Sequence, residues 1–90
     1  MNLNFEEYKK EVLIYNMSFN KFKQYYDDIL NMKNDNKKQA SDYARILSYA
    51  TVTPIGSKYE AFMLKGYVES LRSLVQETLQ SEEEQKVSRR

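Results

Sequence analysis

The first 53 residues of the chain contain neither glycine nor proline. The residues of these two types are Pro54, Gly56 and Gly66. A β-sheet protein needs tight turns at short intervals, and glycine and proline are the residues that most often form them. The N-terminal half is therefore expected to be helical, and we predict an all-α fold without a sheet.

Apolar residues in the N-terminal third recur every three or four positions, which places their side chains along one side of a helix. The repeat matches the seam of a coiled coil, in which apolar residues recur every 3.5 positions on average. The residues of this N-terminal seam are Phe5, Tyr8, Val12, Tyr15, Phe19, Phe22, Tyr26 and Ile29. The segment is therefore predicted to be an amphipathic helix that packs against another helix.

Two capping boxes mark the starts of helices. Asn4 is followed three residues later by Glu7, and Ser57 is followed three residues later by Glu60. In such a box the first side chain accepts a hydrogen bond from a free amide of the first turn, and the acidic residue reaches back to the start. Helices are therefore predicted to begin just after Asn4 and just after Ser57.

The N-terminal helix has two interpretations. It is either one helix over about 5–33 or two helices joined by a hinge near 16–18, with Ser18 capping the second. A tight turn would normally reset the heptad phase, and the phase is unbroken across the hinge. We favour the single long helix, with a kink.

The middle of the chain is predicted to hold a loop and a shorter helix. Residues 32–38 have no apolar periodicity, and Asp35 or Asn36 then caps a helix over about 37–50. The predicted buried stripe of that helix consists mainly of small residues, namely Ala40, Tyr43, Ala44, Leu47 and Ala50. β-branched residues and a proline follow, so the chain is expected to run extended over about 51–56.

The final helix is predicted over about 58–81, with an apolar face nearly half its circumference wide. Gly66 interrupts this helix, and we expect the backbone of another element to cross close to it. Residues 82–90 lose the periodicity and are expected to form a charged, mobile tail. The predicted architecture is one helical domain over 1–81, a small bundle of three to four helices with long N- and C-terminal helices.

Composition excludes several classes of function. The 90 residues have a formal net charge of +1 and contain no histidine and no cysteine. The commonest general base and metal ligands are therefore absent, and we predict a non-enzyme without cofactor or metal. Near-neutrality disfavours nucleic acid as the partner. The apolar runs are too short to span a membrane, so a cytoplasmic protein is expected.

One possible anion-binding site lies at the start of the final helix. Gly56, Ser57 and Lys58 combine free amides, a hydroxyl and an ammonium group at the positive end of a helix dipole. An ordinary capped helix start has the same features, and we favour that interpretation.

The N-terminal seam is the predicted interface. Its aromatic residues bury large areas at low cost in side-chain entropy, which is typical of protein interfaces. A chain of this size also has a thin core. We therefore expect a homodimer or a constitutive complex through Phe5, Tyr8, Val12, Tyr15, Phe19 and Phe22. The alternative is a monomer in which the final helix covers the seam.

The stretch from Lys58 to Val75 contains aromatic residues, a glycine within a helix and then a Leu-Arg-Ser-Leu segment. This pattern resembles one that is common in small bacteriophage proteins. The richness in Asn, Lys, Tyr and Ile is also similar to the products of AT-rich genomes. The resemblance implies a short accessory protein of a phage or mobile element, and such proteins are often inhibitors of host defence or parts of the virion.

We accordingly predict a non-catalytic interaction module that is encoded by a phage. It is expected to act in the host cytoplasm and to inhibit a host defence protein, such as a CRISPR nuclease, by covering its surface. One alternative is a helix-turn-helix-like nucleic-acid-binding protein, with Lys37, Lys38 and Arg45 on phosphates. Another is a minor component of the virion or of its packaging.

Overall fold

The computed structural model describes residues 4–88, and the side chains of residues 4–81. Within these residues the chain forms four helices: α1 (Phe5–Ile14), α2 (Phe19–Asp35), α3 (Lys37–Leu47) and α4 (Lys58–Ser88). The same part of the chain has no β-strand, and one isolated parallel bridge joins Met17 to Val52. The prediction of a small all-α bundle is confirmed.

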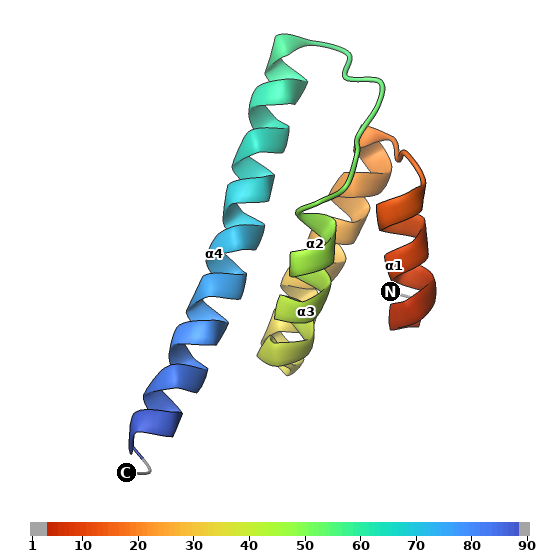
Figure 1. Cartoon of the computed structure of the whole chain (residues 1–90). Helices are drawn as coiled ribbons and strands as arrows, with labels where there is room; N and C mark the ends of the chain where they lie inside the picture. The colour runs from red at the N-terminus through yellow and green to blue at the C-terminus, as the bar shows by residue number, and fades with distance from the viewer. Residues whose placement is uncertain (1–3, 89–90) are drawn as a thin grey trace.

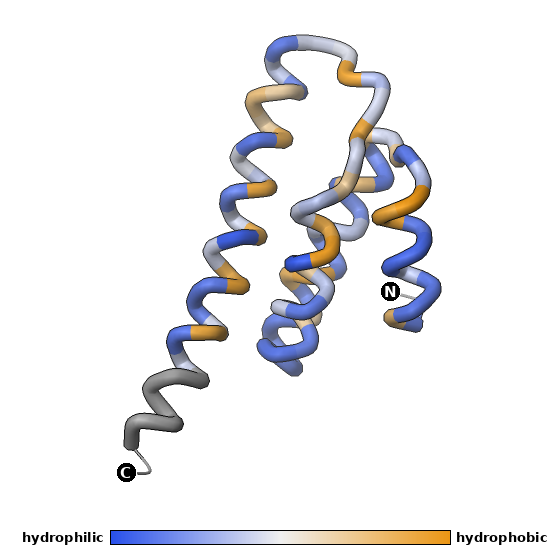
Figure 2. The backbone as a smooth tube through the Cα atoms, viewed as in Figure 1, coloured by the Kyte–Doolittle hydropathy of each residue, from blue (hydrophilic) through white to orange (hydrophobic). Residues whose placement is uncertain are grey.

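The helices α2 and α3 form an antiparallel hairpin (Figure 1). A single residue, Asn36, joins them and caps α3 by accepting a hydrogen bond from the Gln39 amide at 3.1 Å. Helix α1 lies on one side of the hairpin and the much longer α4 on the other (Figure 1). The apolar turns of α4 face the hairpin (Figure 2).

The predicted single helix over 5–33 is wrong, because the chain breaks between Ile14 and Phe19. Ser18 caps α2 by accepting a hydrogen bond from the Lys21 amide at 3.1 Å, as the hinge interpretation expected. The break is held by contacts distant in sequence. Met17 pairs with the segment after α3 through two main-chain hydrogen bonds of 3.0 Å, and its side chain is buried.

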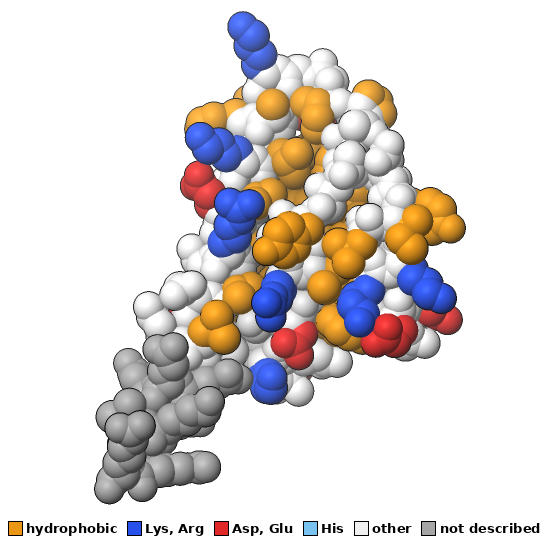
Figure 3. All heavy atoms as spheres, in the orientation of Figure 1, with side chains coloured by type: hydrophobic (Ala, Val, Ile, Leu, Met, Phe, Trp, Pro, Cys, Tyr) orange, Lys and Arg blue, Asp and Glu red, His pale blue; other side chains and the backbone are white. Residues whose placement is uncertain are grey.

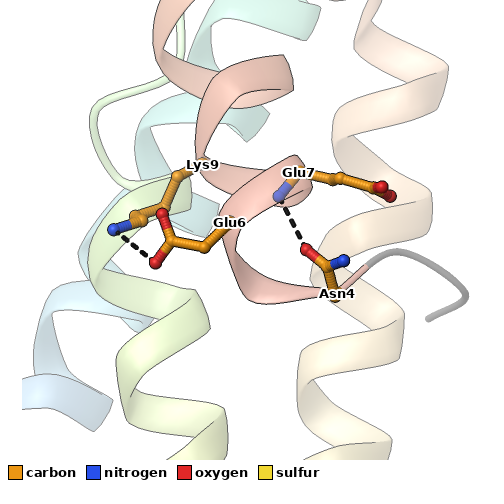
Figure 4. Close-up of polar contacts among 4 residues, drawn as sticks. All are labelled: Asn4, Glu6, Glu7 and Lys9. Carbon is orange, nitrogen blue, oxygen red and sulfur yellow. Dashed lines mark hydrogen bonds and ion pairs between the residues drawn. The ribbon is translucent and has the colours of Figure 1, made fainter.

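The predicted helix starts are confirmed. The Asn4 side chain accepts a hydrogen bond from the Glu7 amide at 2.9 Å (Figure 4). The hydroxyl oxygen of Ser57 accepts one from the Glu60 amide at 3.1 Å. Helix α4 does not end at Ser81 as predicted but continues to Ser88. The predicted mobile tail covers residues 82–90. The side chains of 82–88, and residues 89–90 altogether, lie outside the described part of the chain.

The core forms where all four helices meet. Its largest fully buried side chains include Tyr8, Phe22, Leu47 and Leu71, which come from one helix each. The Tyr8 hydroxyl donates a hydrogen bond of 2.8 Å to the Tyr43 carbonyl, and the two rings lie 4.6 Å apart. Contact between α1 and α3 therefore combines aromatic packing with a buried hydrogen bond.

The position of Gly66 contradicts the prediction of a close backbone crossing. A Cβ atom built there would meet no heavy atom within 4 Å. The glycine therefore has no packing explanation within the described chain.

Tyr8→Phe removes the buried hydrogen bond to Tyr43, and we expect the free energy of unfolding to fall by about 1 kcal/mol. Tyr49→Phe is the matched control, since Tyr49 is 67% exposed and its hydroxyl forms no hydrogen bond among the described residues. Its loss should leave stability nearly unchanged. Urea denaturation followed by circular dichroism measures both, and equal losses would contradict the assignment.

Gly66→Ala should raise the free energy of unfolding by about 1 kcal/mol, because alanine favours the helix and the space is open. Gly56→Ala serves as the control, because a Cβ there would lie 2.5 Å from a Glu60 carboxylate oxygen and displace it. That variant should not gain stability. A loss of stability in Gly66→Ala at low protein concentration would show that the site is crowded.

Candidate functional site

An open groove follows α4 on the side that faces the end of α3 and the connection between these two helices. Two adjoining hollows of about 290 and 390 Å³ form it. The first is lined by Arg45, Ser48, Tyr49, Arg72, Val75, Gln76 and Leu79. The second is lined by Ile55, Ala61, Leu64, Lys65, Val68, Glu69 and Arg72. Because Arg72 lines both hollows, they make one continuous surface, which we call the α4 groove.

The groove exists because α4 is much longer than its neighbour. Helix α3 has 11 residues and α4 has 31, so at 1.5 Å per residue they measure about 16 Å and 46 Å. Leu71 and Leu74 of α4 are buried. The adjacent apolar stripe of α4 is only partly covered, because the chain after α3 runs extended instead of continuing the helix.

The apolar floor of the groove is accessible. Tyr49 is 67% exposed, Leu79 is 47% exposed and Ile55 is 36% exposed, while Leu64, Val68 and Val75 are half-buried. On the face shown in Figure 3, apolar side chains lie between α4 and the elements beside it, with Lys and Arg side chains next to them. Covering such a surface would remove apolar area from water, the main favourable term in protein association.

The charged residues of the groove are mainly basic. Arg45, Arg72 and Lys65 contribute positive charge, and Glu69 is the one acidic residue that lines the hollows. None of these four residues forms an ion pair within the described part of the chain. Arginine binds carboxylates through two parallel hydrogen bonds. The groove can therefore hold an apolar surface that carries acidic groups at its edge.

Sequence reasoning did not find this groove. Arg45 was predicted to contact phosphate, and the apolar face of the final helix was considered only as a cover for the N-terminal seam. The available signal was the width of the apolar face over 58–81, since a face of nearly half the circumference exceeds the stripe that one packed neighbour covers.

The predicted N-terminal interface is corrected by the structure. Tyr8, Val12, Phe19 and Phe22 are between 0 and 7% exposed in the single chain, so a partner cannot reach them. Their cover comes from α3 and α4 as well as from α2, since the rings of Tyr43 and Tyr67 pack on members of the seam. The remaining two predicted interface residues differ: Phe5 is half-buried and Tyr15 is 64% exposed.

The predicted anion site is occupied by the chain's own carboxylate. The Gly56 amide donates a hydrogen bond of 2.7 Å to a carboxylate oxygen of Glu60. Ser57 is engaged with the Glu60 amide, and Lys58 is exposed beside them. A negative charge already lies at this helix start, so it repels an added anion. The capped-helix interpretation is the one that the geometry supports.

The predicted nucleic-acid contacts lie near both ends of α3. The Lys37 ammonium lies 3.6 Å from a Glu77 carboxylate oxygen, whereas Arg45 lines the α4 groove near the other end of α3. Lys38 is exposed on α3. A helix-turn-helix has a turn of about three or four residues and a wide crossing angle. The antiparallel α2–α3 hairpin therefore lacks the helix-turn-helix geometry that this prediction required.

Two tyrosines have strongly raised pKa values. Burial raises the pKa of Tyr8, and the neighbouring phenols of Tyr25 and Tyr43 add to the effect. Burial also raises the pKa of Tyr25, followed by hydrogen bonding to Glu11 and by the negative charges of Glu11 and Asp28. Both phenols therefore keep their protons to a higher pH in the folded chain than an exposed tyrosine does.

Within the described residues, no three Asp or Glu side chains cluster as they would around a metal ion. No helix in that part of the chain combines the length and apolar character needed to cross a bilayer. Comparison of the chain with protein-family models, curated proteins and solved structures found no match.

The raised tyrosine pKa values predict unfolding at alkaline pH. Both values lie above the ordinary 10.0, so the folded chain holds these two protons more tightly than the unfolded chain. The two phenols therefore contribute fully to the free energy of unfolding below about pH 10. Above that pH their contribution falls by about 1.4 kcal/mol per pH unit for each group.

This prediction is checked by following phenolate absorbance and circular dichroism through the same titration. Two of the eight tyrosines should ionise only as the helical signal is lost. The double variant Tyr8→Phe, Tyr25→Phe should depend less steeply on pH above 10. Ionisation of all eight before unfolding would contradict the assignment.

Proposed function

We propose that this chain is a non-catalytic interaction module that binds a helix of a partner protein in the α4 groove. The observation that carries the proposal is the accessible apolar floor beside Arg45 and Arg72, two arginines without ion pairs in the described chain. A groove of this kind fits the helix-in-groove mode, in which an amphipathic helix lays its apolar face into a neighbouring surface.

The chemistry of the groove specifies the partner helix. Its apolar residues would contact Leu64, Val68 and Val75, which are four and seven residues apart and so lie on one face of α4. Acidic residues along its edge would pair with Arg45 and Arg72. Complementary charges raise the association rate and fix the orientation of the partner.

The finer proposal is that the partner is a host defence protein, such as a nuclease, and that the chain is a phage-encoded inhibitor acting in the host cytoplasm. Its support is the resemblance of Lys58–Val75 to small phage proteins. This segment includes Leu64, Val68 and Arg72 of the groove. Inhibition would follow from occlusion, because a helix held in the groove is no longer available to other ligands.

The test compares two double variants as baits in host lysate, with quantitative mass spectrometry of the captured proteins. Tyr49→Ser with Arg72→Glu alters the groove. Tyr15→Ser with Lys10→Glu is the matched control on the α1 side. Tyr15 and Tyr49 are similarly exposed, at 64% and 67%, and each double variant replaces one positive charge with a negative one. We expect one partner to be retained by the wild type and the control and lost by the groove variant.

The dissociation constant is then measured between each variant and the purified partner. The groove variant should weaken the dissociation constant at least tenfold, which is about 1.4 kcal/mol. A partner lost only by the control variant would assign binding to the exposed end of the N-terminal seam instead. Capture that is lost when the lysate is treated with nuclease would indicate nucleic acid, and co-purification with particles would indicate a virion component. Each of these results would overturn the proposal.

A further inference from the structure

Another face of α4 exposes the most accessible large apolar side chains of the described chain. Phe62 is 77% exposed and Tyr59 is 70% exposed. Both lie within the first turns of α4. At 100° per residue, this face lies about 150° around the helix from the α4 groove. A partner helix in the groove therefore leaves Phe62 and Tyr59 uncovered.

A hollow of about 310 Å³ lies at Gly66, about one helical turn along α4 from Phe62. It is lined by Tyr26, Met63, Gly66, Tyr67 and Ser70. A Cβ atom at Gly66 would meet nothing within 4 Å, so the backbone of α4 is open to contact at this point. Glycine weakens a helix interior, and nothing within the described chain requires it here. The most direct physical reason is the close approach of another molecule.

We propose that this face, which we call the Gly66 face, binds a second copy of the chain through an antiparallel pair of α4 helices with Gly66 on the two-fold axis. In such a pair, residues equally far from Gly66 in opposite directions lie opposite each other. Phe62 then lies opposite Ser70 of the second copy, and Tyr59 lies opposite Ser73 of the second copy. Each bulky aromatic ring meets a small residue on both sides of the axis.

Charge also favours the antiparallel arrangement. Lys65 and Glu69 are exposed on the edge that this face shares with the α4 groove, and neither forms an ion pair in the described chain. A two-fold axis at Gly66 places the same edge of both helices side by side, with Lys65 of each copy within a turn of Glu69 of the other. A parallel pair would instead stack Phe62 on Phe62 and Tyr59 on Tyr59, which holds the helices apart where the serines face each other.

The area available indicates a reversible dimer. Each exposed aromatic ring can bury on the order of 150 Å², so the four rings of a pair contribute roughly 600 Å² of the roughly 1,000 Å² that a specific interface needs. The helical contacts around Gly66 and the serines must supply the rest. We therefore expect association in the micromolar range rather than an obligate dimer.

Sedimentation equilibrium from micromolar to sub-millimolar concentration gives the first test. The wild type should be a concentration-dependent dimer, and Phe62→Ser should weaken its association at least tenfold. Ile14→Ser is the matched control on α1, where the side chain is 67% exposed, and it should dimerise as the wild type does. Gly66→Leu should fold with undiminished helical signal, because leucine favours helices, but should not dimerise.

Cysteine cross-linking gives the second test, since the chain has no cysteine of its own. At the two-fold axis, helices about 8–10 Å apart bring the two Cα atoms into the range that a disulfide requires. Gly66→Cys should therefore form a covalent dimer rapidly under mild oxidation. Gln76→Cys is the control, because its two copies would lie about 30 Å apart.

Three results would overturn the proposal. The first is a wild type that stays monomeric at sub-millimolar concentration. The second is a dimer that Phe62→Ser and Gly66→Leu leave unchanged, and the third is a cross-link that forms as fast at position 76 as at position 66. A monomer whose Phe62→Ser variant loses binding to another protein or to lipid vesicles would assign the face to that ligand instead.

Discussion

Two main-chain hydrogen bonds join the connection between α1 and α2 to the segment that follows α3. The Met17 amide donates to the Thr51 carbonyl, and the Thr53 amide donates to the Met17 carbonyl, both at 3.0 Å. Pairing of this kind needs extended chain on both sides, so it is incompatible with one helix through residue 17. It lets α1 fold back beside the α2–α3 hairpin, where Tyr8 reaches Tyr43. It also holds the chain after α3 extended, which leaves much of α4 without a neighbouring helix.

The surface features of the molecule follow from this mismatch in length. A helix of 31 residues packs on helices of 11 and 17 residues, and Leu71 and Leu74 are its members of the buried core. The apolar residues of α4 outside that buried stripe then remain accessible. A small domain buries a smaller fraction of its surface than a large one, so it has few other elements that could cover these residues. If the proposed contacts with other molecules form, they account for the length of α4, which packing within the described chain does not require.

The parts of the fold that depend on neighbouring residues could be predicted from the sequence. The caps at Asn4 and Ser57 and the extended segment before α4 follow from local hydrogen bonding and from the restrictions of proline. The break at Met17 was one of two interpretations, because Ser18 is a good cap, but the sequence could not decide for it, since the bonds that hold it join residues 34 or more positions apart. The 3–4 spacing continues from Val12 to Phe19 because four connecting residues happen to preserve the phase. Spacing alone therefore does not separate a continuous helix from two helices that bury the same stripe.

The functional surfaces were harder to predict for a related reason. Apolar periodicity shows that a residue has a buried or an interacting side, but it does not say whether the cover comes from the same chain. Phe22 and Phe62 are the same residue type on amphipathic helices, yet one is fully buried and the other is 77% exposed. The difference is decided by which helix lies alongside, and that depends on the Met17 pairing far along the chain.

The two open faces of α4 have a joint consequence. They are centred on different sides of the helix and share Lys65 and Glu69 at their common edge, so pairing two chains through the Gly66 face leaves the rest of each α4 groove open. Such a pair would present two equivalent grooves related by a two-fold axis. A partner that is itself oligomeric could then be held at two points, and the second contact would form at a high effective concentration. Weak pairing of the chains and modest affinity of each groove would together be enough for tight binding.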